Sequence, residues 1–133
     1  MSAGVLIDSC LFIDHLRAKD KAQTSLARVL RADTDFFTST IVEYEVEVGM
    51  TPSHRELWDG ILGRLTIYPF ERSTVVLACK IRHQLGEMGK QIEPLDLFIA
   101  ATAMVKDLPL ATLNHKHFKQ IDGLTLFLPE ESL

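Results

Sequence analysis

Three acidic residues that are far apart in the chain have the type and the setting to bind a divalent metal ion. Asp8 directly follows the apolar residues 5–7, Glu45 lies in an apolar stretch, and Asp96 lies near the start of another. Carboxylate oxygens are hard ligands that suit Mg²⁺ or Mn²⁺ better than zinc. Without a cation, crowded carboxylates would repel one another and their pKa values would rise. We therefore expect the three groups to share an ion.

Asn114 is a fourth candidate, because it comes just beyond the apolar residues 108–112. Its side chain would supply a further oxygen or hold Asp8 in place from outside the ligand set. Lys116 and His117 follow it, and for each of these residues taken alone a solvated loop is the ordinary interpretation. Together with the three acids, Asn114 makes four oxygen-bearing groups that we expect at the same end of one sheet.

The stretch STIVEYEVEVG around Glu45 fits two kinds of secondary structure. As a strand, its alternation would point Glu43, Glu45 and Glu47 to solvent together. As a helix, it has a capping-box pattern at Thr40 and Glu43 and a terminating glycine, Gly49. The helix places only Glu45 within the apolar arc, where an uncompensated carboxylate would cost on the order of several kcal/mol. The caps favour the helix, and a proton, a basic group or a metal must then compensate Glu45.

Asp8 and Asp96 also have purely structural interpretations. Asp8 could cap the helix that follows it, although Ser9 could fill that position and leave Asp8 free. Asp96 lies in the first turn of an apolar helix, where the helix dipole favours an acid by about 0.3–1 kcal/mol. Neither interpretation excludes a metal ligand, so both stay open at this stage.

The elements that must position these residues alternate along the chain. Strands are expected at residues 4–7, 35–39, 65–70, 108–112 and 124–128, and helices at 9–18, 21–32, 39–49, 54–65, 72–89 and 94–106. This alternation predicts an α/β fold with a mostly parallel sheet covered by helices on both faces. In such sheets the ligand crevice lies beyond the carboxyl ends of the strands. Asp8 and Asn114 follow predicted strands, and Asp96 lies in the first turn of a predicted helix, as that location requires.

The composition indicates one globular domain spanning residues 1–133 and excludes several classes of protein. The chain is 47% hydrophobic and 24% charged, with 14 basic and 18 acidic residues and a net charge of −4. That charge argues against a broadly cationic nucleic-acid binder, but an acidic metal site would itself subtract charge. Cys10 and Cys79 fit no zinc spacing. Without a signal peptide or a membrane span, we expect a soluble cytoplasmic protein.

An ion held by acidic residues points to phosphate chemistry. It would polarise a water molecule, orient a phosphodiester and neutralise charge in the transition state. The sequence has no Ser-His-Asp pattern, glycine-rich phosphate loop or dinucleotide-binding fingerprint that would compete with this interpretation.

Three segments resemble successive motifs of the PIN domain, in the version found in VapC-type toxins of prokaryotic toxin–antitoxin pairs. They are VLIDSCLFIDHLR, STIVEYEVEVG and IEPLDLFIAATAMVKDLPLATLNHKHFKQIDGLTLF. The resemblance implies a three-layer α/β/α sandwich and a Mg²⁺-dependent endoribonuclease. It also implies a cognate antitoxin and a homodimer formed through helices. The segment ELWDGIL around Trp58 is a candidate interface of that dimer, and burial of Trp58 in the core is the alternative.

By position, the resemblance makes Asp8, Glu45 and Asp96 the metal ligands and adds Asn114 to the catalytic group. The residues expected to support the site or to contact RNA are Ser9, Thr112, His117, Lys116 and Arg82, with Lys90 and Lys119 as further phosphate contacts. Two departures from the family pattern stand out: Cys10 replaces a common asparagine, and His117 stands where many members have an acid. Because of the second departure, the number of metal ions in the site, one or two, stays open.

Two other classes of function compete with the nuclease. A receiver-like signalling domain also gathers acids and Mg²⁺ at strand ends, but it needs an acidic neighbour beside Asp8 and a lysine after a late strand. A degenerate PIN domain that binds RNA or a partner without cleavage is the other alternative, and Cys10 and His117 keep it open.

Overall fold

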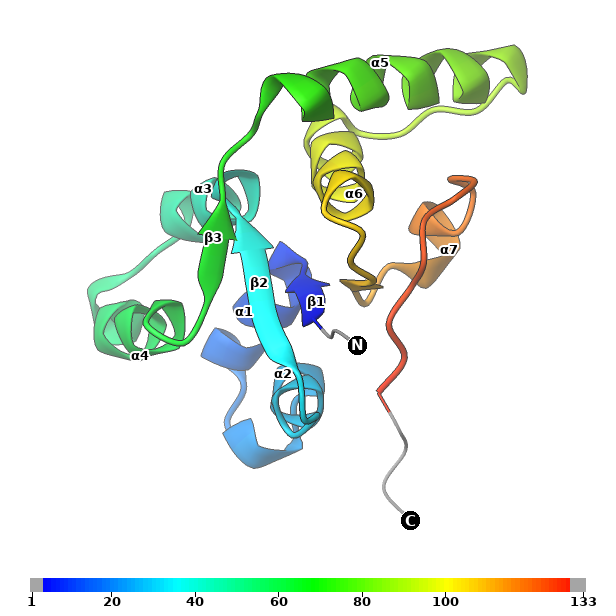
Figure 1. The fold of residues 1–133 in the computed structure, drawn as a ribbon. Coiled ribbons are helices and arrows are strands. Elements are labelled where there is room, and N and C mark those ends of the chain that lie inside the picture. The colour runs from blue at the N-terminus through cyan, green and yellow to red at the C-terminus, as the bar shows by residue number, and fades with distance from the viewer. Residues whose placement is uncertain (1–3, 130–133) are drawn as a thin grey trace.

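Four short strands form a parallel sheet with the order β3-β2-β1-β4 (Figure 1). The computed structural model describes residues 4–129. The strands are β1 (Gly4–Ile7), β2 (Asp35–Ser39), β3 (Thr66–Tyr68) and β4 (Leu110–Ala111). The central strand β1 is the most buried, with Val5, Leu6 and Ile7 fully enclosed, as expected for a parallel sheet covered by helices.

The register places the carboxyl ends of β1 and β4 side by side. Ile7 pairs with Ala111, and the backbone N–H of Asp8 donates to the Ala111 carbonyl at 2.9 Å. On the other side of β1, the Thr38 hydroxyl donates to the Ile7 carbonyl at 2.8 Å. The residues that follow β1 and β4, Asp8 and Thr112, are therefore direct neighbours.

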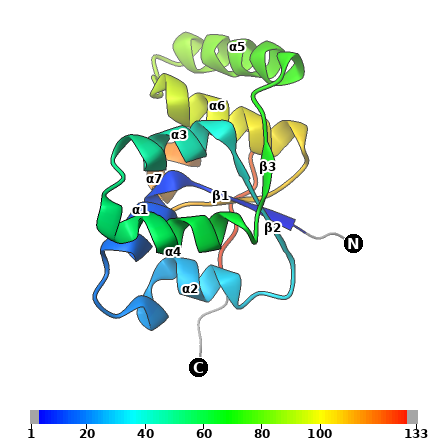
Figure 2. The ribbon, with the colours of Figure 1, turned by 90° about the vertical axis from the view of Figure 1, so that its left-hand side faces the viewer.

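Helices flank the sheet, which confirms the predicted α/β architecture (Figure 2). They are α1 (Ser9–Arg17), η1 (Lys21–Gln23), α2 (Ser25–Leu30), α3 (Thr40–Val48), α4 (Pro52–Leu62), α5 (Arg72–Glu87), α6 (Pro94–Val105) and α7 (His115–Phe118). Helix α1 contacts α2, α3 and α4, and the long α5 packs along α6. The layers bring α1, α3 and α6 together around the end of β1.

Two of the expected elements differ in the structure. The helix predicted at residues 21–32 is divided, because Thr24 caps a new helix by accepting from the Ala27 N–H at 3.1 Å. The strand predicted at 124–128 is reduced to a single bridge between Leu110 and Leu126. With β4 only two residues long, little strand is available there for further pairing.

Trp58 lies in the core and not on an interface. It is fully buried and meets Phe12 edge-on, with ring centroids 5.0 Å apart. Its indole N–H donates to Glu47 at 2.8 Å. Of the two alternatives for Trp58, the structure shows burial in the core, where the residue joins α4 to the rest of the fold.

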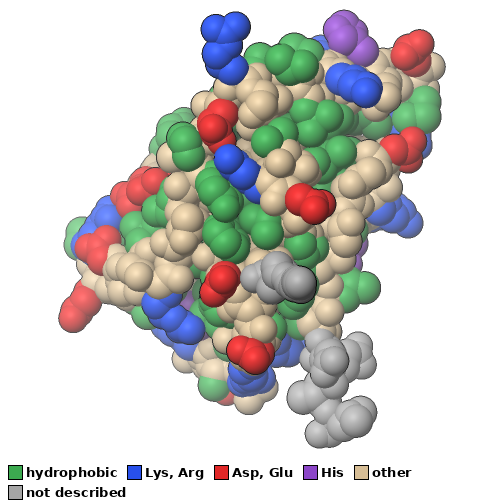
Figure 3. All heavy atoms as spheres, in the orientation of Figure 1, with side chains coloured by type: hydrophobic (Ala, Val, Ile, Leu, Met, Phe, Trp, Pro, Cys, Tyr) green, Lys and Arg blue, Asp and Glu red, His purple; other side chains and the backbone are tan. Residues whose placement is uncertain are grey.

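The face seen in Figure 3 carries charged side chains of both signs among hydrophobic ones, without a broad basic surface. This distribution agrees with the net charge of −4. None of the helices within residues 4–129 combines the length and the apolar character that crossing a bilayer demands. The cytoplasmic location stays a prediction.

Candidate metal centre

Asp8 lies at the carboxyl end of β1 and caps α1. Its Oδ1 accepts a hydrogen bond from the Ser9 N–H at 2.8 Å, and its Oδ2 accepts one from the Thr112 hydroxyl at 2.8 Å. The residue is only 4% exposed. The expectation that Ser9 would cap the helix and leave Asp8 free is therefore wrong. Ser9 is the first helical residue, and the cap itself fixes the direction of the Asp8 carboxylate.

Glu45 is carried by a helix, as predicted, but the capping box expected at Thr40 and Glu43 is wrong. The residue that caps α3 is Ser39, whose hydroxyl accepts from the Val42 N–H at 3.2 Å, and Thr40 is the first residue of the helix. Glu45 is half-buried. Its Oε1 accepts a hydrogen bond from the Ser9 hydroxyl at 2.8 Å, so the start of α1 positions this carboxylate too.

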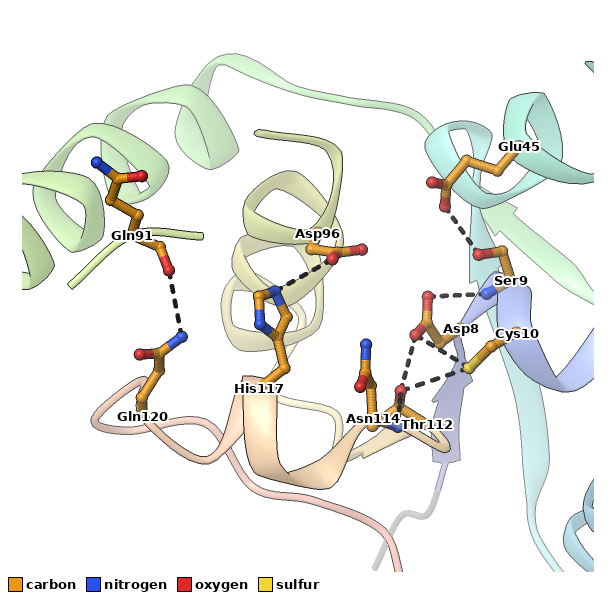
Figure 4. Close-up of polar contacts among 10 residues, drawn as sticks. All are labelled: Asp8, Ser9, Cys10, Glu45, Gln91, Asp96, Thr112, Asn114, His117 and Gln120. Carbon is orange, nitrogen blue, oxygen red and sulfur yellow. Dashed lines mark hydrogen bonds and ion pairs between the residues drawn. The ribbon is translucent and has the colours of Figure 1, made fainter. Parts of the chain in front are cut away.

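Asp96 lies in the first turn of α6, which begins at Pro94. Its carboxylate is half-buried, and Oδ2 is 3.3 Å from Nε2 of His117 in α7. The helix therefore presents Asp96 at the same end of the sheet as Asp8, with His117 on one side of the carboxylate (Figure 4).

The three carboxylates converge. One oxygen from each of Asp8, Glu45 and Asp96 lies within 4.8 Å of the others (Figure 4). Within residues 4–129, no lysine or arginine forms an ion pair with any of the three. Hard oxygen donors without a lysine or arginine partner suit a divalent cation, so the residues present fit a metal centre.

Electrostatics in the cluster point the same way. Burial is the main cause that raises the pKa of Glu45, and the charges of Asp8 and Asp96 add to it, while the Ser9 hydroxyl opposes the rise. Burial and the charge of Asp8 likewise raise the pKa of Asp96, against the lowering effect of His117. Both groups thus resist ionisation in the absence of a cation, and a bound cation would remove that resistance.

Sequence reasoning missed one acid near the cluster. Glu93 precedes α6 as its N-cap residue, and its charge contributes to the raised pKa values of both Glu45 and Asp96. Glu93 comes three residues before Asp96, directly before the predicted helix, and this position was the signal in the sequence that could have identified it. Glu93 adds negative charge at the exposed edge of the centre.

Thr112, and not Asn114, holds Asp8 in place. The Asn114 side chain has no hydrogen bond within the described chain, although its backbone N–H donates to the Thr112 hydroxyl at 3.0 Å. Cys10 also reaches Asp8, since its thiol donates to Oδ2 at 3.4 Å and accepts from the Leu113 N–H at 3.3 Å. Burial, followed by the Asp8 charge, raises the Cys10 pKa to about 11, so the thiol stays protonated beside Asp8.

The candidate RNA contacts lie in different places. Lys116 is exposed on α7, one residue before His117. Arg82 instead lines a separate hollow of about 230 Å³ with Lys90, at the end of α5. Figure 4 shows the neighbouring Gln91, whose carbonyl accepts from Gln120 at 3.5 Å, on the far side of His117 from Asp8.

The fold and this arrangement of acids define the class of protein. The model of the PIN domain family matches residues 5–124, and the chain therefore belongs to the PIN domain family. The receiver-like alternative is wrong.

Within that class, the chain is similar to Ribonuclease VapC10 of Mycobacterium tuberculosis, with 33% identity over 121 residues that cover 90% of each chain. Solved structures share the fold, and two of them serve as examples. VapBC2 from Rickettsia felis, bound to a DNA fragment from their promoter, matches at 23% identity with a TM-score of 0.80, covering 93% of this chain and 97% of that one. A toxin–antitoxin complex from Klebsiella pneumoniae matches at 24% identity with a TM-score of 0.72, covering 96% and 99%.

Proposed function

We propose that this protein is a metal-dependent endoribonuclease and the toxin of a toxin–antitoxin pair. The observation that carries the proposal is the convergence of carboxylate oxygens from Asp8, Glu45 and Asp96 to within 4.8 Å of one another. The 33% identity with a ribonuclease over 90% of both chains supports RNA as the substrate.

Asp8, Glu45 and Asp96 would hold the ion, and Mg²⁺ or Mn²⁺ suits a donor set made of carboxylate oxygens. A divalent cation there would polarise a water molecule and offset the negative charge that develops on a phosphodiester during cleavage. The proposal requires only one ion.

Neighbouring side chains keep the three acids in place for this role. The Thr112 hydroxyl and the Ser9 N–H orient Asp8, and the Ser9 hydroxyl orients Glu45. His117 lies beside Asp96 at 3.3 Å, and we assign it to positioning that carboxylate. Positioning of this kind matters because ligand orientation sets metal affinity.

The substrate would be held by groups around the acids. We assign Lys116 to a phosphate of the bound RNA, because it is exposed on the short helix that carries His117. Asn114, at the start of that helix, has a side chain free within residues 4–129 to donate to or accept from RNA. Arg82 would contact RNA further from the acids, together with Lys90.

The VapC-type motifs lead us to propose a cognate antitoxin and a homodimer as well. A short neighbouring gene encoding a DNA-binding protein is the expected source of the antitoxin. Its co-expression should relieve growth arrest caused by this protein, and chromatography of the pair should show a complex.

The central experiment is Asp96→Asn, which keeps the shape of the side chain and removes its charge. We expect RNA cleavage with Mg²⁺ or Mn²⁺ to fall at least about 100-fold, since the charge stabilisation supplied by a metal is worth several kcal/mol. Growth arrest should disappear while the circular dichroism spectrum stays unchanged.

Asp107→Asn is the matched control, because Asp107 is an exposed acid just beyond the opposite end of α6. It should cleave like the wild type. Full cleavage by the Asp96→Asn variant would remove the metal centre from the mechanism. A wild-type protein that binds the metal but cuts no RNA would instead be a non-cleaving PIN domain.

A further inference from the structure

A hollow lies next to the metal centre, between α1, α3 and α4, which lie together at the left of Figure 2. Its apolar lining comes from Ile13, Leu16, Val46 and Met50, and its volume is about 120 Å³. Leu16 and Val46 are buried parts of the core, so these walls are firmly held. The thioether of Met50 can adapt to an occupant. We call this feature the α1–α3 hollow.

Glu45 belongs both to the acidic cluster and to the lining of the α1–α3 hollow. Ser9 at the start of α1 holds its Oε1 at 2.8 Å. A group in the hollow would therefore lie beside a side chain of the metal centre itself. If a phosphodiester lies at the acids, the hollow is within reach of the adjoining nucleotide.

Two polar side chains stand among the apolar ones. Arg17 is exposed and His54 is half-buried, and both line the hollow. Within residues 4–129 neither forms an ion pair. The His54 ring is held through Nδ1, which is 3.3 Å from the Thr51 hydroxyl. Arginine and histidine planes stack on unpaired bases and donate hydrogen bonds to their edges.

We propose that the α1–α3 hollow binds one unstacked nucleobase of single-stranded RNA, in the nucleotide next to the phosphodiester that the metal centre cleaves. This inference rests on the proposed nuclease function. Apolar walls suit the face of a base, and Arg17 and His54 suit its edge. The hollow is small beside the roughly 300–1,000 Å³ of pockets that hold drug-sized ligands, so a single ring system fits its size better than a peptide helix laid in a groove.

Gly49 makes the proposal testable without disturbing the core. It lines the hollow at the end of α3, its φ is −104°, and a Cβ atom added there meets no other heavy atom within 4 Å. Gly60 in α4 has equally open surroundings but does not line the hollow. Gly49→Leu and Gly60→Leu are therefore a matched pair. Arg17→Ala and Arg28→Ala form a second pair, because both arginines are exposed and only Arg17 lines the hollow.

The experiment compares two substrates in Mn²⁺. One is a single-stranded RNA with a randomised centre, sequenced after cleavage, and the other is bis(p-nitrophenyl) phosphate, which has no base. The wild type should prefer certain bases at a position flanking the cut. Gly49→Leu and Arg17→Ala should flatten that preference and lower RNA kcat/KM at least about tenfold more than they lower hydrolysis of the small diester. Gly60→Leu and Arg28→Ala should keep the wild-type profile.

The outcomes separate this inference from the nuclease function. If the wild type cleaves RNA and both hollow variants keep its base preference, the nucleobase assignment is overturned and the nuclease function stands. If those variants instead keep the base preference and bind the antitoxin less tightly, the hollow binds a peptide segment, and the nucleobase assignment is equally overturned. If the wild type cleaves neither substrate, both proposals fail together.

Discussion

The three acids differ in how tightly the chain holds them. Asp8 is buried and fixed by a helix cap and by Thr112. Glu45 depends on a single hydroxyl, that of Ser9, and Asp96 on His117. Their roles are therefore open to separate tests by substitutions that keep the size of each side chain.

Glu45→Gln and Glu43→Gln test which glutamate of α3 belongs to the centre. We expect Glu45→Gln to reduce RNA cleavage at least about 100-fold, because it removes a charged ligand from the acidic cluster. Glu43→Gln should change cleavage less than about twofold, since Glu43 lies outside the cluster within the described chain. The measurement is the rate of RNA cleavage at saturating Mg²⁺. Equal losses of rate in the two variants would contradict the assignment of Glu45, and not Glu43, to the metal centre.

Thr112→Val tests whether the hydroxyl that reaches Asp8 at 2.8 Å supports the ligand. The substitution keeps the shape of the side chain and removes the donor, so metal affinity should fall about 10–100-fold while the ligands remain. Calorimetric titration with Mn²⁺ measures this directly. Thr125→Val, at an exposed position, is the matched control, and an unchanged affinity in Thr112→Val would show that Asp8 needs no such support.

At the scale of elements, Glu47 joins α3 to α4. It accepts the indole N–H of the buried Trp58 at 2.8 Å and pairs with Arg55 through both carboxylate oxygens. The hydrogen bonds from Arg55 are the largest cause that lowers the Glu47 pKa. Glu47 keeps 34% of its side chain exposed. Helix α4 lies beside that side of α3, so Arg55 and Trp58 both reach the carboxylate.

Glu47→Ala should therefore destabilise the fold. It leaves the Trp58 N–H without its partner, which costs about 1–3 kcal/mol of unfolding free energy. Arg55→Ala should destabilise the fold less than Glu47→Ala does, because the ion pairs of Arg55 are on the surface. Urea denaturation followed by Trp58 fluorescence gives both values, with the exposed Glu56→Ala as the control. If Arg55→Ala loses more unfolding free energy than Glu47→Ala, the ion pair with Arg55 joins α3 to α4, and the hydrogen bond from the Trp58 indole does not.

At the scale of the whole molecule, the fold forces negative charges together. The carboxyl end of β1 and the first turn of α6 meet beside α3, although their acids are far apart in the chain. Burial is the main cause of the raised pKa values of Glu45 and Asp96, and repulsion from the neighbouring carboxylates adds to it. Because the folded state binds these protons more tightly than the unfolded state, the metal-free protein loses stability as pH rises through the raised pKa values.

A divalent cation should reverse this dependence. It binds the folded protein and competes with protons for the carboxylates, so Mn²⁺ should raise the melting temperature more at about pH 7.5 than at about pH 5. Asp96→Asn should melt higher than the wild type without metal at the upper pH, because one repelling charge is gone, and should respond less to Mn²⁺. Thermal melts of both proteins at the two pH values, with and without metal, provide the test. A wild-type melting temperature that Mn²⁺ leaves unchanged at both pH values would argue against a metal centre.

Local patterns in the sequence were sufficient for most of the elements and for singling out the three acids. The apolar run before Asp8 predicted β1, and Pro94 marked the start of α6. The capping signals chose a helix for the segment of Glu45, and that helix distinguishes Glu45 from its neighbours. These inferences succeed because backbone caps and apolar periodicity act over a few residues.

Only the tertiary structure decided which groups support the site. The choice of Thr112 over Asn114 as the partner of Asp8 depends on the β1–β4 register. The burial of Trp58 and the pairing of Glu47 with Arg55 depend on how α4 packs against α3 and α1. Distances between distant segments arise from packing and strand pairing that no local pattern encodes. The sequence by itself therefore determined the kinds of chemical groups available, whereas the folded chain determined which of them meet.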